Sequence, residues 1–179
     1  IGEAFAAEQD GLAALIPQAH LIRAFEIMTE CYYNLGVLYT TSEQQEGFLA
    51  YRYKTAKLPI HPALRMALRM IMEIPLPSLL KIASGADELY AKIYKSEPEY
   101  IAISMVVVLK PFQGKGFMRQ VLDEPFRIAE ERSIPCVLDT DTPLKAAKYA
   151  RCGMEKSAEK RLKNGVCLYT MCFKHKKAN

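Results

Sequence analysis

Two glycines that follow a strongly apolar segment could form an anion-binding turn. The segment Gln113-Gly114-Lys115-Gly116-Phe117-Met118 comes shortly after the apolar run Met105–Leu109. Glycine lets a backbone approach a ligand closely, and the first turn of a following helix offers free N–H groups and the positive end of the helix dipole. The pattern predicts a phosphate-binding turn, although a single Gly-x-Gly is also typical of a plain strand-to-helix turn.

The sequence argues against two common phosphate loops. The pattern Gly-x-x-x-x-Gly-Lys-Ser/Thr does not occur, and Arg119 stands where a Gly-x-Gly-x-x-Gly loop would have its third glycine. A nucleotide triphosphatase and a classical dinucleotide enzyme are therefore disfavoured.

A second strand-and-helix unit follows the first. Residues Pro135–Asp139 are typical of a short strand, and Thr142 before Pro143 is a typical helix N-cap. Tyr149 lies on this predicted helix, and Gly153 closes it as a C-terminal glycine.

These two units resemble the GNAT superfamily of acetyl-CoA-dependent N-acetyltransferases. The segment Gln113–Met118 is similar to the family's Gln/Arg-x-x-Gly-x-Gly/Ala signature, with Met118 at the last position. The segment Leu138–Lys145, followed by Tyr149 and Cys152-Gly153-Met154, is similar to the family's second signature. The resemblance covers most of the chain, from Gly2 onward.

The resemblance implies where acetyl-CoA would bind. The pantetheine arm would lie along a splayed strand edge formed by Val106, Val107 and Val108, much as an added strand would. The backbone N–H groups of Gly114 to Met118 would hold the pyrophosphate, and an N–H near Val108 would polarise the thioester carbonyl. The implied cofactor-binding residues are Val106, Val107, Val108, Gln113, Gly114, Lys115, Gly116, Phe117 and Met118.

Tyr149 would be the catalytic residue under the same resemblance. It would stand near the sulfur and protonate the departing thiolate as a general acid. The alternative is a half-buried tyrosine that packs its helix against the sheet. Lys145 could reach a phosphate of the cofactor, or it could be an ordinary solvated lysine.

The acceptor side is less defined. Proton removal from an ammonium acceptor needs a base, for which Glu26, Glu30, Glu73 and Glu99 are formal candidates and a chain of waters is an alternative. The family builds its acceptor pocket from the first helices and the connection before the central strand. Residues 20–100 contain aromatic residues, methionines and few charges, which favours a small or amphiphilic amine.

Apolar periodicity predicts the helices that would surround this site. Helical spacing covers residues 1–33, where Pro17 separates two helices, and residues 62–94, which prolines interrupt near Ile74–Pro77. Met66, Met70 and Met72 on the first helix of the second region are more typical of an adaptable core than of a flexible pocket wall. A further helix runs from the glycine turn to about Arg132 and contains Pro125.

Strand signals complete the predicted sheet. Tyr100–Leu109 is expected to be buried on both faces in the middle of a sheet. Two hairpins are predicted, at Leu35–Thr41 with Gly47–Tyr53 and at Glu155–Leu162 with Val166–Phe173; Asn164-Gly165 is a strong turn signal for the second. The expected fold class is α/β (α+β), a mixed, mostly antiparallel GNAT-like sheet flanked by helices and splayed around a CoA cleft. Residues 1–179 are expected to form one domain, whose family-typical first strand is missing or lies upstream.

Composition limits the remaining function classes. The net charge of +4, from 24 basic and 20 acidic residues, includes one basic run, Lys174–Lys177, so a nucleic-acid partner is disfavoured. Five cysteines in a chain of this length favour reduced thiols in the cytoplasm over a disulfide framework. Cys152, Cys167, Cys172 and His175 could hold zinc on paper, but Cys167 and Cys172 would point to opposite faces of a strand, so no metal is expected. No signal peptide or membrane span is apparent, and no membrane partner is expected.

These observations predict an enzyme that transfers an acetyl group from acetyl-CoA to a primary amine on a small molecule or a peptide, by direct attack in a ternary complex. The alternative is a non-catalytic acyl-CoA-binding or interaction module with the same fold. A homodimer is an open alternative to a monomer.

Overall fold

A six-stranded mixed sheet organises the part of the chain that the structure, a computed structural model, describes: residues 2–3, 10–85 and 88–174. The strand order is β1-β2-β3-β4-β6-β5. β3 and β4 run parallel, whereas the other neighbouring pairs are antiparallel. The strands are β1 (Leu38–Thr40), β2 (Gly47–Tyr53), β3 (Ile101–Val108), β4 (Cys136–Thr140), β5 (Glu155–Arg161) and β6 (Cys167–Phe173).

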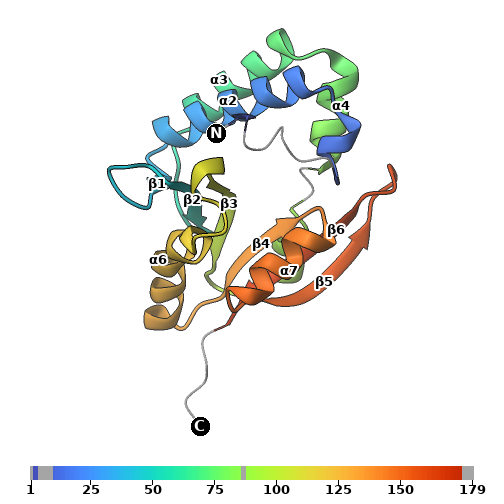
Figure 1. Ribbon diagram of the computed structural model, residues 1–179. Helices are drawn as coiled ribbons and strands as arrows, with labels where there is room; N and C mark the ends of the chain where they lie inside the picture. Colours follow the sequence, from blue (N-terminus) through green and yellow to red (C-terminus); the bar gives the residue numbers. More distant parts are fainter. Residues whose placement is uncertain (1, 4–9, 86–87, 175–179) are drawn as a thin grey trace.

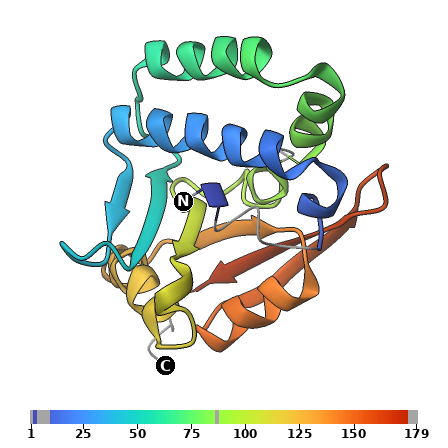
Figure 2. The same cartoon turned by 45° about the horizontal axis from the view of Figure 1, so that its top comes forward.

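Helices cover both faces of this sheet (Figure 1). α6 packs on β2 and β3, and α7 packs on β5 and β6, whereas α5 lies against β4 and β6 and α2 against β1. α3 packs on α2, on the side away from the sheet (Figure 2). The α-helices are α2 (Gln18–Asn34), α3 (Ile60–Glu73), α4 (Leu76–Gly85), α5 (Leu89–Ile93), α6 (Phe117–Arg132) and α7 (Pro143–Arg151), and the short 3₁₀ helices are η1 (Ala13–Leu15) and η2 (Lys110–Phe112).

Alternating side chains of the central strands form separate cores on the two faces. Ile101 and Leu138 join the main core with Phe126 of α6. The neighbouring residues Ala102 and Val137 pack on the opposite face in a cluster with tyrosines of α5. The central strand is therefore covered on both sides, as its apolar run predicts.

A bulge and an early end of pairing separate β3 from β4. Ser104 is an extra residue in β3, because Ile103 pairs with Tyr51 and Met105 pairs with Ala50. The register between β3 and β4 consists of Ile101–Cys136 and Ala102–Val137. Beyond these pairs β3 stays bonded to β2 alone, so its edge toward β4 is open, as the expected splayed sheet requires.

The predicted helices from Gln18 onward are confirmed, except that the region 62–94 is divided further. The prediction for the residues before Pro17 also needs a correction. The described part of residues 1–16 includes a 3₁₀ turn at Ala13–Leu15 in place of a helix up to Pro17, and residues 1 and 4–9 lie outside the described residues. The region 62–94 forms three helices, α3, α4 and α5, because Pro75 follows α3 and a break separates α4 from α5.

The predicted strands and caps are confirmed closely. The hairpin of β5 and β6 turns at Asn164-Gly165, where Gly165 has a φ of 88°. The first hairpin has a shorter strand than expected, Leu38–Thr40. The Thr142 side chain caps α7 by accepting a hydrogen bond from Lys145 N at 3.1 Å.

The cysteines show no sign of a disulfide or metal framework. All five are free, and three of them, Cys31, Cys136 and Cys172, are buried. Among the described residues no group of His, Cys, Asp or Glu could hold a metal ion, and His175 of the paper zinc site lies outside those residues. Within the same residues no helix is long and apolar enough to cross a membrane.

Candidate functional site

The glycine turn adopts the conformation that its sequence predicts. Gly114 and Gly116 have φ values of 77° and 87°, which residues with a side chain rarely adopt. A Cβ atom at either position would meet no other atom within 4 Å. The space in front of the turn is therefore open to a ligand.

The amide groups of this turn are suited to binding an anion. Gly116 supplies no side-chain cap to α6, and the first backbone bond at this helix end runs from Arg119 N to Gly116 O at 3.0 Å. Within residues 10–85 and 88–174, the amides from Gly114 to Met118 donate to no protein acceptor. Unsatisfied amides at the positive end of a 16-residue helix suit a phosphate group.

Side chains of the turn hold it against the end of β3. Gln113 donates from Nε2 to Val108 O at 3.0 Å, so its side chain fastens the turn to the strand. Phe117 packs edge-on against Phe112 with ring centroids 5.5 Å apart. Lys115 Nζ lies 5.9 Å from the same Phe112 ring.

The three valines of β3 face different sides. Each is paired on the β2 side, Val106 with Leu49 and Val108 with Gly47, for example. The side chain of Val106 packs on the main core, as do those of Met118 and Tyr149. Val107 faces the opposite side, in the cluster with Ala50 and Met105.

Three predicted site residues from three elements pack against the main core. Val106 of β3, Met118 of α6 and Tyr149 of α7 contact the same core cluster beside the open edge of β3. Tyr149 is partly buried there, and its carbonyl accepts hydrogen bonds from Cys152 N and Met154 N at 3.0 and 3.2 Å. The tyrosine thus packs α7 against the main core.

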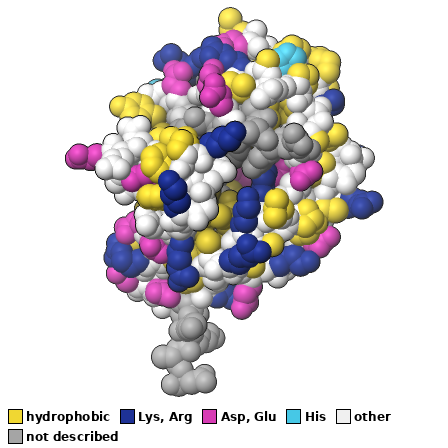
Figure 3. Space-filling model, viewed as in Figure 1, with side chains coloured by type: hydrophobic (Ala, Val, Ile, Leu, Met, Phe, Trp, Pro, Cys, Tyr) yellow, Lys and Arg dark blue, Asp and Glu magenta, His cyan; other side chains and the backbone are white. Residues whose placement is uncertain are grey.

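Basic side chains gather on the same face of the molecule. Figure 3 shows Lys and Arg side chains around its middle. The exposed basic residues of the turn, α6 and α7 are Lys110, Lys115, Arg119, Arg127, Arg132, Lys148 and Arg151. Lys145 is not among them, because its Nζ donates to Asp141 Oδ1 at 2.6 Å. The positive charge on this face would attract an anionic ligand.

The four candidate bases all have other partners. Glu26 and Glu73 accept hydrogen bonds from Arg23, and Glu30 pairs with Arg65 and Arg69 in the same network between α2 and α3. Glu99 accepts from the Thr55 hydroxyl and from Tyr100 N. None of these carboxylates lies on β3 or β4 beside the open edge.

A carboxylate that the sequence did not single out as a base lies closer to that edge. Asp139 stands two residues beyond the last β3–β4 pair, on the face opposite Leu138. It accepts hydrogen bonds from Thr170 Oγ1 at 2.6 Å and from Tyr90 N at 3.1 Å. Burial raises the pKa of this carboxyl, although these hydrogen bonds oppose the rise.

Two polar groups of β3 and α2 lie on this second face. Ser104, the bulged residue, is exposed and hydrogen-bonds with the hydroxyl of Tyr32. Burial raises the pKa of Tyr32 to about 12, so the phenol stays neutral near pH 7. Alternation from Ile103 places Ser104 on this face, and the bulge leaves it without a partner residue on β2.

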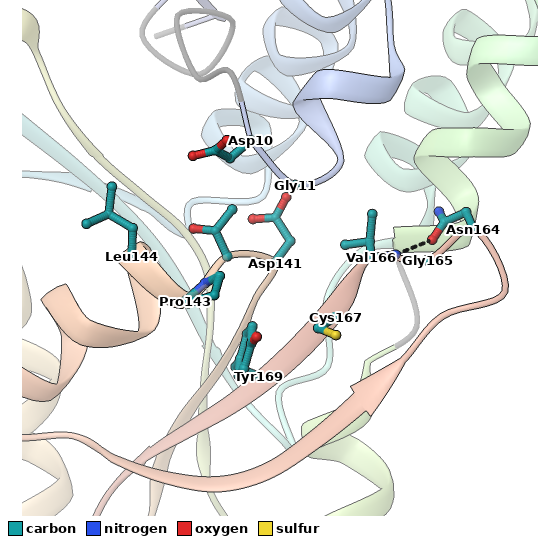
Figure 4. Close-up of a pocket in the computed structure, with 11 residues that line it drawn as sticks. Asp10, Gly11, Asp141, Pro143, Leu144, Asn164, Gly165, Val166, Cys167 and Tyr169 are labelled. Atoms are coloured by element: carbon teal, nitrogen blue, oxygen red, sulfur yellow. Dashed lines mark hydrogen bonds between the residues drawn. The ribbon is translucent and has the colours of Figure 1, made fainter.

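A cavity of 710 Å³ opens at the far end of β4 (Figure 4). Its wall combines carboxylates with apolar side chains, and the residues are Asp10, Gly11, Asp141, Thr142, Pro143, Leu144, Asn164, Gly165, Val166, Cys167 and Tyr169. Asp141 accepts from Leu12 N at 2.8 Å, which fastens the Asp10–Leu12 turn to the start of α7. The sequence pointed to residues 20–100 for the acceptor pocket, whereas this cavity is lined by earlier and later residues.

Solved structures with the same arrangement identify the fold. The chain matches arylalkylamine N-acetyltransferase 2 from Aedes aegypti over 96% of its own length and 89% of that chain, with 16% identity and a TM-score of 0.59. It matches an N-acetyltransferase from Staphylococcus aureus Mu50 over 90% and 84%, with 15% identity and a TM-score of 0.50. The chain has the GNAT fold. The predicted fold class is confirmed by these matches.

The similarity to proteins of the GNAT fold is structural. No protein-family model matches the sequence, and no curated protein sequence matches it. Two further structures, from Agrobacterium tumefaciens and Escherichia coli, match with TM-scores of 0.38 and 0.43, and the chain spans only 56% and 66% of their lengths. Matches at this level of identity establish the GNAT fold and leave activity to be argued from the site.

Proposed function

We propose that the protein is an acyltransferase that moves an acetyl group from acetyl-CoA to a primary amine, by direct attack in a ternary complex. The observation that carries the proposal is the glycine turn beside the open edge of β3, whose amide N–H groups donate to no acceptor among the described residues. Acetyl-CoA supplies an activated thioester carbonyl when bound. Residues of this chain bind the cofactor and the acceptor and supply the proton for the leaving group.

The turn and the strand edge hold the two ends of the cofactor in this proposal. The amides of Gly114 to Met118 bind the pyrophosphate, and the exposed basic side chains around the turn add attraction. The open edge from Val106 to Val108 accepts the pantetheine arm as an extra strand would be accepted. An N–H near Val108 donates to the thioester oxygen; loss of one such donor typically lowers a rate by about 10²–10³.

Tyr149 donates the proton that the departing thiolate needs. Its place in the cluster with Val106 and Met118, next to the strand edge, supports this role. A phenol is a suitable acid for a thiolate because its proton is retained at neutral pH and can be transferred as negative charge develops on sulfur.

The cavity at the end of β4 is the proposed acceptor site. Asp10 gives it negative charge, since Asp141 is paired with Lys145, and Leu144, Val166 and Tyr169 give it an apolar wall. This combination favours an ammonium group on an apolar body, and the volume falls within the usual range for small-ligand sites, about 300–1,000 Å³. A small amine or the end of a peptide would fit these properties.

A non-catalytic CoA-binding module is the second candidate. The observation that favours it is the engagement of Glu26, Glu30, Glu73 and Glu99 with other groups. Asp139 is also hydrogen-bonded to Thr170 and Tyr90. Under this alternative, acetyl-CoA binds and no thiol is released with any amine.

Calorimetry and a thiol-release assay test the two candidates. Titration with acetyl-CoA is expected to show binding, and absence of binding at millimolar cofactor would exclude both candidates. A panel of primary amines then separates them, since release of free CoA supports the enzyme. Binding without release across aromatic, aliphatic and peptide amines supports the module.

The Tyr149→Phe variant tests the proton donor. Removal of the hydroxyl is expected to lower kcat by about 10²–10⁴ while the Kd of acetyl-CoA changes little, because positioned general acids typically contribute this much. Tyr33→Phe on α2, where the side chain is 74% exposed, is the matched control and should keep full activity. Equal turnover by the Tyr149 variant and the control would show that Tyr149 only packs α7.

A further inference from the structure

The outer surface of α3 and α4 carries an unusually large apolar patch for the surface of a soluble domain. Seven large side chains there are between 53% and 82% exposed: Ile60, Leu64, Leu68, Ile71, Met72, Leu76 and Leu80. We call this set the α3–α4 patch. Figure 2 shows that α3 is the outermost helix on this side, with α2 between it and the sheet.

α3 carries apolar side chains on two sides, one packed against α2 and one facing outward. Its inner side contacts α2, where Met70 is buried with Ala24 and Ile27. The charged residues of α3 lie on the flank toward α2, where Arg65 pairs with Glu30 at 3.1 Å and Arg69 with Glu73 at 2.7 Å. A surface helix normally carries polar residues on its outer side, whereas the outer side of α3 is apolar, as though a second partner covered it.

The outer surface of α3 has a ridge and a groove of the kind that pack against a second helix. Large side chains four residues apart form a ridge along the helix: Ile60, Leu64, Leu68 and Met72. The neighbouring row begins with Ala63 and Ala67, both exposed, and these small residues leave a groove beside the ridge. Helices commonly pack with ridges of this i, i+4 kind in one another's grooves, crossing at about −50°.

The ridge and the groove lie on the same face, so the face is complementary to itself. A two-fold axis through the middle of α3 would place the ridge of each copy in the groove of the other, which is the isologous arrangement that most homodimers use.

The size of the patch also fits a second copy. From the exposed fractions of its seven side chains, the patch presents roughly 900 Å² of apolar surface, compared with about 800 Å² per partner in a standard stable interface. The largest apolar patch on a typical monomer is about 300–600 Å².

A membrane surface fits less well. The arginines beside the patch are paired with carboxylates of α2 and α3, so they offer little free positive charge to anionic headgroups. Interfacial helices typically carry unpaired Lys and Arg on their polar side, with aromatic anchors at their edges. The α3–α4 patch contains no aromatic side chain.

We propose that the protein forms a two-fold homodimer through the α3–α4 patch, with α3 of one copy crossing α3 of the other. This dimer is independent of the proposed acetyl transfer, because the patch lies on α3 and α4 and the glycine turn lies on the opposite side of the sheet from α2.

Two variants of opposite chemistry test the dimer by sedimentation equilibrium over 0.1–100 µM, concentrations chosen to span the affinities of about 10⁻⁶ M that modest dimers show. The wild type is expected to be dimeric at the upper end. Leu68→Glu removes one ridge side chain from each copy and should raise the dimer dissociation constant by about 100-fold or more. Ala67→Trp adds apolar surface but fills the groove, and it should weaken the dimer too.

The control and the opposing outcomes separate this dimer from other uses of the patch. Tyr33→Glu changes an exposed side chain outside the patch and should leave the dimer intact. A wild type that stays monomeric throughout, or a dimer that survives both Leu68→Glu and Ala67→Trp, overturns the proposal. Tighter association of Ala67→Trp overturns ridge-in-groove packing. Monomers that co-sediment with vesicles of phosphatidylcholine and phosphatidylglycerol would instead assign the patch to a membrane surface.

Discussion

Gly116 holds the backbone conformation from which α6 begins. Its φ of 87° costs a residue with a Cβ about 1–2 kcal/mol. Gly116→Ala should therefore lower the free energy of unfolding by about that amount. The variant should also weaken acetyl-CoA binding by about tenfold or more, which corresponds to about 1.4 kcal/mol, because the new methyl group enters the open space in front of the amides. Chemical denaturation and calorimetry measure the two effects.

Gly165→Ala provides a control with the same backbone strain. Gly165 has a φ of 88°, and a Cβ there would also meet nothing within 4 Å, but it lies in the β5–β6 turn. This variant should lose a similar amount of stability and keep its affinity for acetyl-CoA. If both variants lose affinity equally, the glycine turn of α6 is not the phosphate site.

Asp139 should make stability depend on pH in a direction unusual for a carboxyl group. Burial raises its pKa above the ordinary value of 3.8, so the folded protein binds the proton more tightly than the unfolded chain does. The contribution of Asp139 to the free energy of unfolding is then fully present below pH 3.8 and is lost as pH rises through the folded-state pKa. Asp139→Asn removes this titration.

The difference in unfolding free energy between wild type and Asp139→Asn should therefore fall as pH increases from about 3.8 and level off above the folded-state pKa. Thr170→Val removes a hydrogen bond that lowers this pKa, so it should extend the fall to higher pH. Urea denaturation across pH 3.5–8, a range around the ordinary carboxyl value of about 3.9, measures both effects. A difference that grows with pH would show that the folded-state pKa is lowered.

Local patterns predicted some residues of the site and not others. The glycine turn follows from backbone freedom alone, which a short sequence window contains. Asp139 could not be assigned to its partners, because the N–H of Tyr90 that it binds is 49 residues away and is brought there by the sheet. Lys145 differs, because its ammonium pairs with Asp141 only four residues away, a local partner that the sequence contains.

At the scale of the element, the N-cap of α7 should support the position of Tyr149. Thr142 is buried and accepts a hydrogen bond from Lys145 N at 3.1 Å. Thr142→Ala should lower the free energy of unfolding by about 0.5–2 kcal/mol, the usual loss for an N-cap. Thr142→Ser keeps the oxygen and should lose much less. Equal losses in thermal or urea denaturation would assign the effect to the buried methyl group.

Elements with strong local signals were predicted well, and those that depend on packing were not. The run Met105–Leu109 and the Asn164-Gly165 turn give β3 and the last hairpin nearly to the residue. The outward apolar side of α3 has the same periodicity as an inward one, so the sequence alone does not show which side is covered. The Ser104 bulge depends on the register with β2 and leaves no local signal.

At the scale of the whole molecule, the order of the elements carried the fold prediction. A central strand, a glycine turn and a helix, followed by a second strand and helix and a final hairpin, are predicted in the order in which the structure has them along the chain. The number of residues over which β3 and β4 pair could not be predicted from the sequence. Two register pairs join these strands, and nothing in the local sequence marks the position at which pairing stops.

The open stretch of β3 also bears on how the sheet is protected from pairing with other sheets. Unpaired strand edges are templates for edge-to-edge aggregation, and proteins protect them with short or charged strands. Both outer edges follow this rule: β1 has three residues, and β5 carries Glu155, Lys156, Glu159, Lys160 and Arg161. The third edge, on β3, is apolar but lies inside the sheet between β2 and β4. A strand that belongs to the sheet of another folded molecule cannot reach this recessed edge. The edge is therefore accessible only to a single extended ligand or peptide.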